Sequence, residues 1–99
     1  MIFGIDIDGT LNADPAMWYH VLPHILSHGH TLVTVTSRRD TFENRREIEA
    51  LMVEVLGKTW PCVFAYDRPK KLAAIEAGHH IDIFVDDQPH MIGTGGESL

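Results

Sequence analysis

The sequence predicts a small layered α/β fold built on a parallel sheet of about four strands. Four short runs rich in β-branched and aromatic residues have strand character, and segments with helical signals separate them. Strands and helices that alternate in this way are typical of parallel strands joined by right-handed crossovers. A chain of 99 residues has apolar material for one core, so a single domain over 1–99 is expected. The runs expected as strands are 2–6 (IFGID), 31–36 (TLVTVT), 62–66 (CVFAY) and 81–86 (IDIFVD).

Three helices are expected between these strands. The first begins with the helix-start signal Pro15 and stops at Gly29, and Pro23 is expected to kink it or to divide it in two. The second is expected over 41–56, where apolar residues recur at helical spacing. The third is short and covers about 69–77. Residues 91–99 contain little apolar material, so a short closing element or a loose tail is expected there.

Composition and charge exclude several classes of function. The net charge of −6 argues against a general electrostatic hold on nucleic acid, although the uneven spread of basic residues leaves room for a local basic site. The single cysteine, Cys62, cannot form an internal disulfide and is expected to be a buried thiol. With no signal peptide and no apolar stretch of membrane-spanning length, a cytoplasmic protein without a membrane partner is expected.

Polar residues follow three of the four expected strands. In a parallel sheet, ligands bind outside the carboxyl ends of the strands, so these residues are expected to meet at one edge. They form a group of acids, hydroxyls and one basic residue. The group contains Asp6, Asp8, Gly9 and Thr10 after the first strand, Thr36, Ser37 and Arg38 after the second, and Asp86 and Asp87 after the last.

The clustered acids predict a metal site. Carboxylates held together without counter-charge repel one another by several kcal/mol, and a hard divalent cation relieves this repulsion. Oxygen ligands without nearby Cys or His favour Mg²⁺ over Zn²⁺, and the small number of protein donors favours Mg²⁺ over Ca²⁺. The expected ligands are Asp6, Asp8, Asp86 and Asp87. A bound Mg²⁺ in such a site suggests phosphoryl transfer.

These motifs resemble those of the haloacid dehalogenase-like (HAD) superfamily of phosphohydrolases. The stretch DIDGTL looks like the family's first motif, LVTVTSR resembles the second, PKK at 69–71 could supply the lysine of the third, and IFVDD is similar to the fourth. All four occur in the family's order and together cover nearly the whole chain. The resemblance implies a three-layer Rossmann-like fold and a phosphatase activity.

The resemblance also implies a role for each residue of the group. Asp6 would be the nucleophile that forms an aspartyl-phosphate, and Asp8 would be the general acid and then the base. Mg²⁺ would be held by Asp6, Asp86 and the backbone carbonyl of Asp8. Thr36 and a lysine would stabilise charge on the phosphoryl oxygens. Thr36 is favoured over Ser37 because it stands where the strand ends.

Other assignments stay open. One apolar repeat does not decide whether Lys70 or Lys71 points into the site, so both are candidates. Gly9, Thr10, Ser37 and Arg38 are the expected contacts of the substrate. For Arg38 and its neighbour Arg39, a grip on the substrate phosphate and surface ion pairs with Asp40 and Glu43 are about equally expected.

Larger members of the family carry a cap domain, and this chain has no room for one. The site is therefore expected to be open. An open site suits a phosphorylated substrate that is large, such as a nucleic-acid end or a phosphoprotein, although a small molecule is also compatible. A second copy of the chain in a homo-oligomer could supply the missing lid.

Several neighbouring patterns have plainer interpretations. His20, His24 and His28 recur at helical spacing and invite a metal interpretation, but a solvated helix face is favoured because no acidic partner is near. Trp18 and Tyr19 could stack on a substrate, but packing in or beside the core is favoured.

Two other functions compete with the phosphatase. The first is a binding or regulatory module that keeps the fold and the metal but has lost turnover. The second is a receiver-like phosphoacceptor domain, whose acceptor would have to be Asp67 after the third strand. The order of the motifs argues against the receiver.

Overall fold

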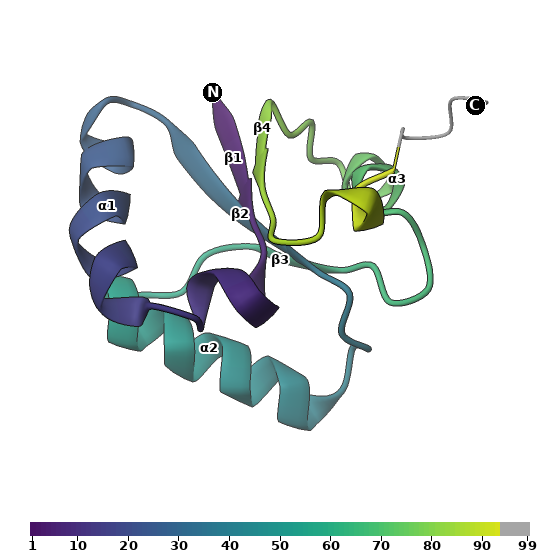
Figure 1. Ribbon diagram of the computed structural model, residues 1–99, viewed down its shortest axis with the longest axis horizontal. Coiled ribbons are helices and arrows are strands. Elements are labelled where there is room, and N and C mark those ends of the chain that lie inside the picture. Colours follow the sequence, from purple (N-terminus) through teal and green to yellow (C-terminus); the bar gives the residue numbers. More distant parts are fainter. Residues whose placement is uncertain (94–99) are drawn as a thin grey trace.

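The computed structural model of the chain describes residues 1–93 as an α/β fold around a parallel sheet. The last six residues of the expected tail lie outside this range. The strands are β1 (Ile2–Ile5), β2 (Thr31–Thr36), β3 (Cys62–Phe64) and β4 (Ile83–Val85), in the order β3-β2-β1-β4 (Figure 1). All pairs are parallel, which confirms the predicted sheet and is compatible with a small Rossmann-like fold.

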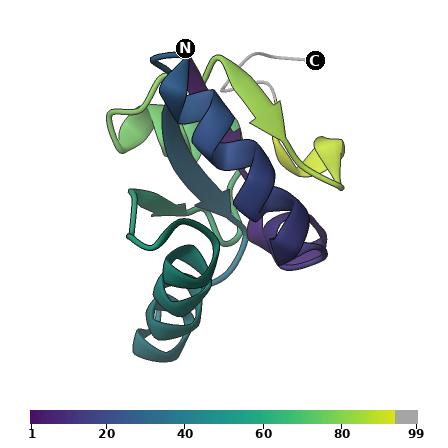
Figure 2. The same ribbon diagram turned by 90° about the vertical axis from the view of Figure 1, so that its left-hand side faces the viewer.

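Three helices cover the two faces of the sheet. They are α1 (Pro15–Ser27), α2 (Phe42–Leu56) and α3 (Lys70–Glu76). The first two pack together on one face, and α3 packs against β2 and β3 on the other (Figures 1 and 2). A short 3₁₀ turn, Pro89–Met91, follows β4. Among the helices of residues 1–93, none combines the length and the apolar character needed to cross a bilayer.

The helix ends have local causes in the sequence. The Asp14 side chain accepts a hydrogen bond from the Met17 backbone N–H at the start of α1. At the other end of α2, Gly57 takes a left-handed conformation with φ 76°. The expected division of α1 at Pro23 does not occur, because the helix continues through this residue. The carbonyl that Pro23 leaves without its helical donor belongs to the exposed Tyr19, where water can bind it.

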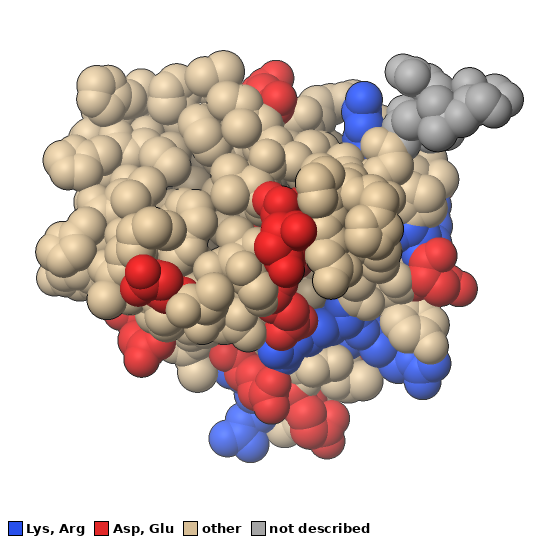
Figure 3. Space-filling view, viewed as in Figure 1, with Lys and Arg blue, Asp and Glu red and all other residues tan. Residues whose placement is uncertain are grey.

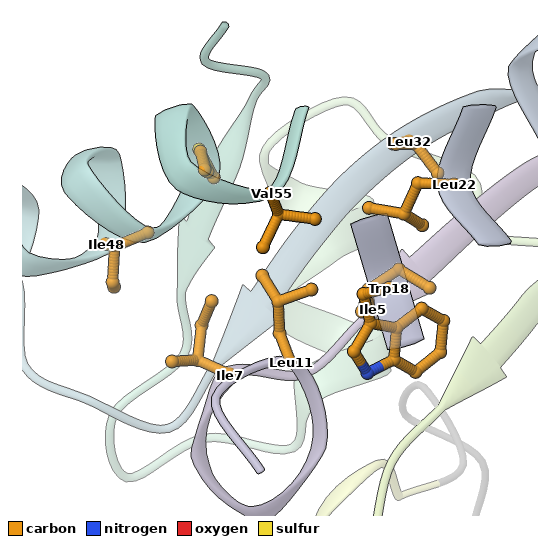
Figure 4. Close-up of a cluster of buried hydrophobic side chains, with 9 residues drawn as sticks. Ile5, Ile7, Leu11, Trp18, Leu22, Leu32, Ile48 and Val55 are labelled. Carbon is orange, nitrogen blue, oxygen red and sulfur yellow. The ribbon is translucent and has the colours of Figure 1, made fainter. Parts of the chain in front are cut away.

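The main core lies between the sheet and the α1–α2 layer (Figure 4). Its most buried members come from β1, from the loop after it, from β2 and from both helices. They are Ile5, Ile7, Leu11, Trp18, Leu22, Leu32, Ile48, Met52 and Val55. A second, smaller cluster under α3 is built from valines and alanines. Cys62 is only half-buried, and burial raises the pKa of its thiol to about 12.

Trp18 is a core residue with a polar anchor. Its side chain is 7% exposed, and its indole N–H donates a hydrogen bond to the Thr10 carbonyl at 3.0 Å. We expect Trp18→Phe to lower the free energy of unfolding by about 0.5–1.5 kcal/mol, because it removes one of the two hydrogen bonds to that carbonyl, which also accepts the Ala13 N–H at 3.3 Å. Tyr19→Phe is the matched control, since Tyr19 is 58% exposed. Equal urea midpoints for the two variants would contradict the prediction.

The last strand, β4, lies beside the first strand, β1. The path moves from β1 outward through β2 to β3, and then returns to the other side of β1 for β4. The order of the strands therefore reverses between β1 and β4. In open α/β sheets the crevice at such a reversal is where ligands bind.

Candidate functional site

Three acids meet at the reversal point. Asp6 follows β1 and Asp86 follows β4, and the pairing of Ile5 with Val85 places the two acids side by side. Together with Asp87 they present carboxylate oxygens that all lie within 4.8 Å of one another. In Figure 3 acidic side chains form a strip near the middle of the face, with basic side chains gathered at its lower end. The predicted meeting of acids from the first and last strands is present.

Lys70 lies among these acids. Its ammonium donates hydrogen bonds to Asp6 Oδ1 at 2.8 Å and to Asp86 Oδ2 at 2.5 Å, and the residue is 2% exposed. Lys71 is half-buried, and within residues 1–93 its side chain makes none of the hydrogen bonds or ion pairs found. Of the two candidate lysines, the structure places Lys70 in the site.

The charges of this cluster do not cancel. One ammonium faces three carboxylates, so full ionisation leaves two net negative charges. Burial raises the pKa of the Asp6 carboxyl to about 6, while Lys70 opposes the rise and Asp86 adds to it. Oxygen donors with this residual charge fit a hard divalent cation, and Asp6, Asp86 and Asp87 could hold one.

The loop Ile7–Leu11 turns sharply after Asp6 and carries three other predicted residues. Gly9 has φ 79°, and a Cβ on it would lie 2.2 Å from Asp87 Oδ2, so a side chain there would disturb the acids. Its N–H donates to Asn12 Oδ1. Thr10 is buried, with its hydroxyl 3.4 Å from Asp6 Oδ2. Thr10 therefore contacts the predicted nucleophile instead of the cavity.

Asp8 is bound by Arg38. The guanidinium binds it through two hydrogen bonds, from Nε at 2.9 Å and from Nη2 at 2.8 Å. Arg38 also donates to Glu47 Oε2 at 2.6 Å and to Asn44 Oδ1 at 3.3 Å, both on α2. Its ion pairs thus differ from those expected with Asp40 and Glu43. The hydrogen bonds from Arg38 hold the pKa of Asp8 below its usual range, and the Asp8 side chain lies outside the group of potential metal ligands.

The two hydroxyl residues at the end of β2 have different surroundings. Thr36 is 1% exposed, and its Oγ1 accepts a hydrogen bond from the Arg38 backbone N–H at 3.2 Å. Ser37, the residue that sequence reasoning ranked second, lines the cavity over the acids. This cavity has a volume of about 100 Å³. Its walls are Asp6, Asp8, Ser37, Lys70, Asp86, Asp87, Gln88 and Met91.

Some residues of the site gave no clear signal in the sequence. Gln88, just before the 3₁₀ turn that follows β4, and Met91, the last residue of that turn and the first of the expected tail, both line the cavity. The N–H of Lys71 donates to the Ile92 carbonyl, which ties this turn to the start of α3. Asn12 donates to Asp8 Oδ1 at 3.1 Å, and its position one helical turn after Asp8 is a signal that could have been used.

The histidine row of α1 is not part of the site. His20, His24 and His28 are all exposed, as favoured from the sequence. The three acids at the sheet edge are the only group of potential metal ligands found in residues 1–93. A larger cavity of about 390 Å³ lies at the opposite end of the sheet, with mainly apolar walls such as Leu26, Leu32 and Trp60.

Comparison of the chain with protein-family models, with curated proteins and with solved structures finds no match. The functional interpretation therefore depends on the geometry of the site. The features that carry it are the buried pair of Asp6 and Lys70 and the carboxylates beside them.

Proposed function

We propose that this chain is a Mg²⁺-dependent phosphatase of the HAD type that hydrolyses a phosphomonoester through an aspartyl-phosphate on Asp6. One observation carries the proposal: a buried aspartate at the carboxyl end of β1 shares a lysine ammonium with a second acid after β4. The chemistry needs an anionic nucleophile that can approach an anionic phosphate. Positive charge fixed beside Asp6 supports that approach.

In the first step an Asp6 carboxylate oxygen attacks phosphorus. The new bond joins this oxygen to phosphorus, and the bond from phosphorus to the ester oxygen breaks. The leaving oxygen departs as an anion when its alcohol is acidic, and otherwise takes a proton from the protonated form of Asp8 or from water. In the second step water attacks the aspartyl-phosphate, which releases phosphate and restores the Asp6 carboxylate. A Mg²⁺ held by Asp6, Asp86 and Asp87 would supply Lewis-acid stabilisation of the phosphoryl charge.

The ion pair with Arg38 supports a role for Asp8 mainly in the second step. An Asp8 with a lowered pKa is ionised at neutral pH and is ready to accept a proton from the attacking water. Acting as an acid in the first step requires a proton on this carboxylate, which the guanidinium opposes. We therefore expect substrates with good leaving groups, such as p-nitrophenyl phosphate, to be cleaved faster than alkyl phosphates.

The decisive experiment is hydrolysis of p-nitrophenyl phosphate by the wild-type protein with Mg²⁺ and with EDTA. Turnover that EDTA removes and Mg²⁺ restores supports the proposal. Stabilisation by Mg²⁺ without any turnover would instead support the second candidate, a binding module. The bidentate hold of Arg38 on Asp8 favours this alternative, since it keeps the expected acid ionised.

The receiver-like function receives no support from the geometry. Its acceptor would be Asp67, which is exposed and follows the edge strand β3, two strands away from β1. A phosphoacceptor would need to lie beside the metal-binding acids. Asp67 is not in the group formed by Asp6, Asp86 and Asp87.

Binding of Mg²⁺ is expected to weaken as the pH falls through about 6. Burial raises the pKa of Asp6 to about 6, so below this pH the folded protein holds a proton there that the cation must displace. The increase in Tm caused by Mg²⁺ should therefore be large at about pH 8 and small at about pH 5. In Asp6→Asn this dependence should be lost. An equal increase in Tm at both pH values would contradict the prediction.

A further inference from the structure

A second arrangement of side chains lies on the same edge of the sheet, beyond β3. The guanidinium carbon of Arg39 lies 4.5 Å from the centre of the Tyr66 ring, and Nη2 of Arg39 donates to the Tyr66 hydroxyl at 2.5 Å. We call this pair the Tyr66–Arg39 platform. Tyr66 is 46% exposed and belongs to neither hydrophobic cluster. Its ring therefore contributes little to the core.

The backbone holds Tyr66 in a conformation that side chains avoid. The Arg68 N–H donates to the Ala65 carbonyl at 3.1 Å, which closes a tight turn with Tyr66 at its second position. There Tyr66 has φ 54°, and it is the only residue with positive φ other than glycine in residues 1–93. A bulky residue at such a position is strained, and glycine is the usual occupant. An exposed aromatic ring kept at a strained position is better explained by binding than by packing.

The register of the strands places the platform at the same carboxyl edge of the sheet as the site, outside the residues that line its cavity. Thr36 pairs with Phe64, and the Ala65 N–H donates to the Thr36 carbonyl, so Tyr66 lies in the turn directly after the last contact between β2 and β3. Because β3 is separated from β1 by β2, the platform is displaced sideways from Asp6 by about 10 Å, two strand spacings. An aromatic ring bonded directly to a phosphate at Asp6 is too short to reach the platform. A substrate needs a spacer between its phosphate and its flat group.

We propose that the Tyr66–Arg39 platform is a nucleobase subsite and that the substrate is a nucleoside monophosphate. This proposal rests on the phosphatase function proposed above. The π-face of a base stacks on tyrosine or on a guanidinium plane, and the ribose provides the spacer. Arg39 has N–H donors besides the one given to Tyr66, and guanidinium donors pair with the edge acceptors of guanine.

Two competing substrates fit less well. The ring of phosphotyrosine is joined to its phosphate without a spacer, and it offers no edge acceptors to Arg39. A long nucleic acid would bring many phosphates against a chain of net charge −6. A single nucleotide brings one phosphate, whose charge a Mg²⁺ held by Asp6, Asp86 and Asp87 would balance.

Binding measurements test this subsite separately from turnover. In an Asp6→Asn background with Mg²⁺, which prevents consumption of the ligand, we would compare guanosine 5′-monophosphate with ribose 5-phosphate by calorimetry. The two ligands differ only in the base. We expect the nucleotide to bind about 5- to 100-fold more tightly, the range typical of one stacked base. Equal affinities, or tighter binding of O-phosphotyrosine than of the nucleotide, would overturn the proposal.

Variants of Tyr66 separate recognition from structure. Tyr66→Ala should remove the preference for the nucleotide and leave ribose 5-phosphate binding unchanged, while Tyr66→Phe should keep most of the preference. Tyr66→Gly removes the ring and relieves the strained φ, so it gives the same readout in a variant that folds. Tyr19→Ala, at another exposed tyrosine, is the control. An equal loss for both ligands in Tyr66→Ala would mean that the platform is only structural.

Turnover of p-nitrophenyl phosphate by the wild-type protein decides the proposed function on its own. Turnover without a preference for the nucleotide would overturn the subsite and leave the phosphatase standing. A preference for the nucleotide without turnover would support the subsite and overturn the phosphatase.

Discussion

Replacing Asp6 by Asn is expected to lower kcat for p-nitrophenyl phosphate by at least about 1,000-fold, because an amide oxygen is a far poorer nucleophile than a carboxylate. The fold should survive this change. Burial raises the pKa of Asp6, which means that the folded state disfavours its ionised form. The neutral amide removes this cost, and the pair of Lys70 with Asp86 stays in place. We therefore expect the metal-free variant to have a Tm no lower than that of the wild type.

Asp40→Asn is the matched control for this variant. Asp40 is an exposed aspartate whose partner is Arg45, and neither residue lines the cavity over the acids. Its replacement should leave kcat within about twofold of the wild type, as for surface changes that touch no reacting group. Turnover by Asp6→Asn at the wild-type rate, with the control equally active, would exclude Asp6 as the nucleophile.

Replacing Lys70 by Met is expected to lower the free energy of unfolding by about 3–5 kcal/mol at neutral pH, because it leaves two buried carboxylates without their counter-charge. The side chains involved are almost fully buried, with 3% exposure for Lys70 and 2% for Asp86, so solvent does little to screen the loss. The adjacent Lys71→Met is the control and should change stability by no more than about 0.5 kcal/mol. Urea unfolding of both variants measures the difference.

Two conditions should rescue Lys70→Met. Burial raises the pKa of Asp6 to about 6 and Lys70 opposes this rise, so the stability difference from the wild type should shrink as the pH falls below about 6 and Asp6 takes up a proton. Mg²⁺ should raise the Tm of this variant more than that of the wild type, since the cation replaces the missing positive charge. Equal stability of Lys70→Met and Lys71→Met would show that the ammonium of Lys70 does not compensate the acids.

The residues at the carboxyl edge of the sheet could be predicted because their positions depend on the order of strands and helices along the chain. Strands that alternate with helices place their carboxyl ends together, so the positions of Asp6 and Asp86 follow from the pattern alone. The identity of the lysine could not be predicted in the same way. The one apolar repeat near the lysines, Leu72 and Ile75, did not decide between them, and Ile75 is 37% exposed. The buried face is instead formed by Lys70, Ala73 and Ala74, at 2%, 5% and 1% exposure.

Small side chains explain why Lys70 lies on the buried face of α3. Alanine at 73 and 74 lets α3 lie close against the valines of β2 and β3, and this close approach carries Lys70 under the acids. The pairing of Asp8 with Arg38 was missed for a similar reason. It depends on Glu47 and Asn44 reaching across from α2, and no local pattern near either residue records a contact between distant elements.

The position of β4 has a consequence for the growing chain. Of the four strands of this sheet, β1 leaves the ribosome first and β4 last, yet β1 pairs with β4 along Phe3, Gly4 and Ile5. Until β4 is synthesised, β1 has one edge of unpaired backbone groups, and such an edge can pair with other nascent chains. Asp86, the second acid that binds Lys70 beside Asp6, is also synthesised only after β4. The acidic edge of the sheet is therefore completed late in synthesis, when the open edge of β1 is closed.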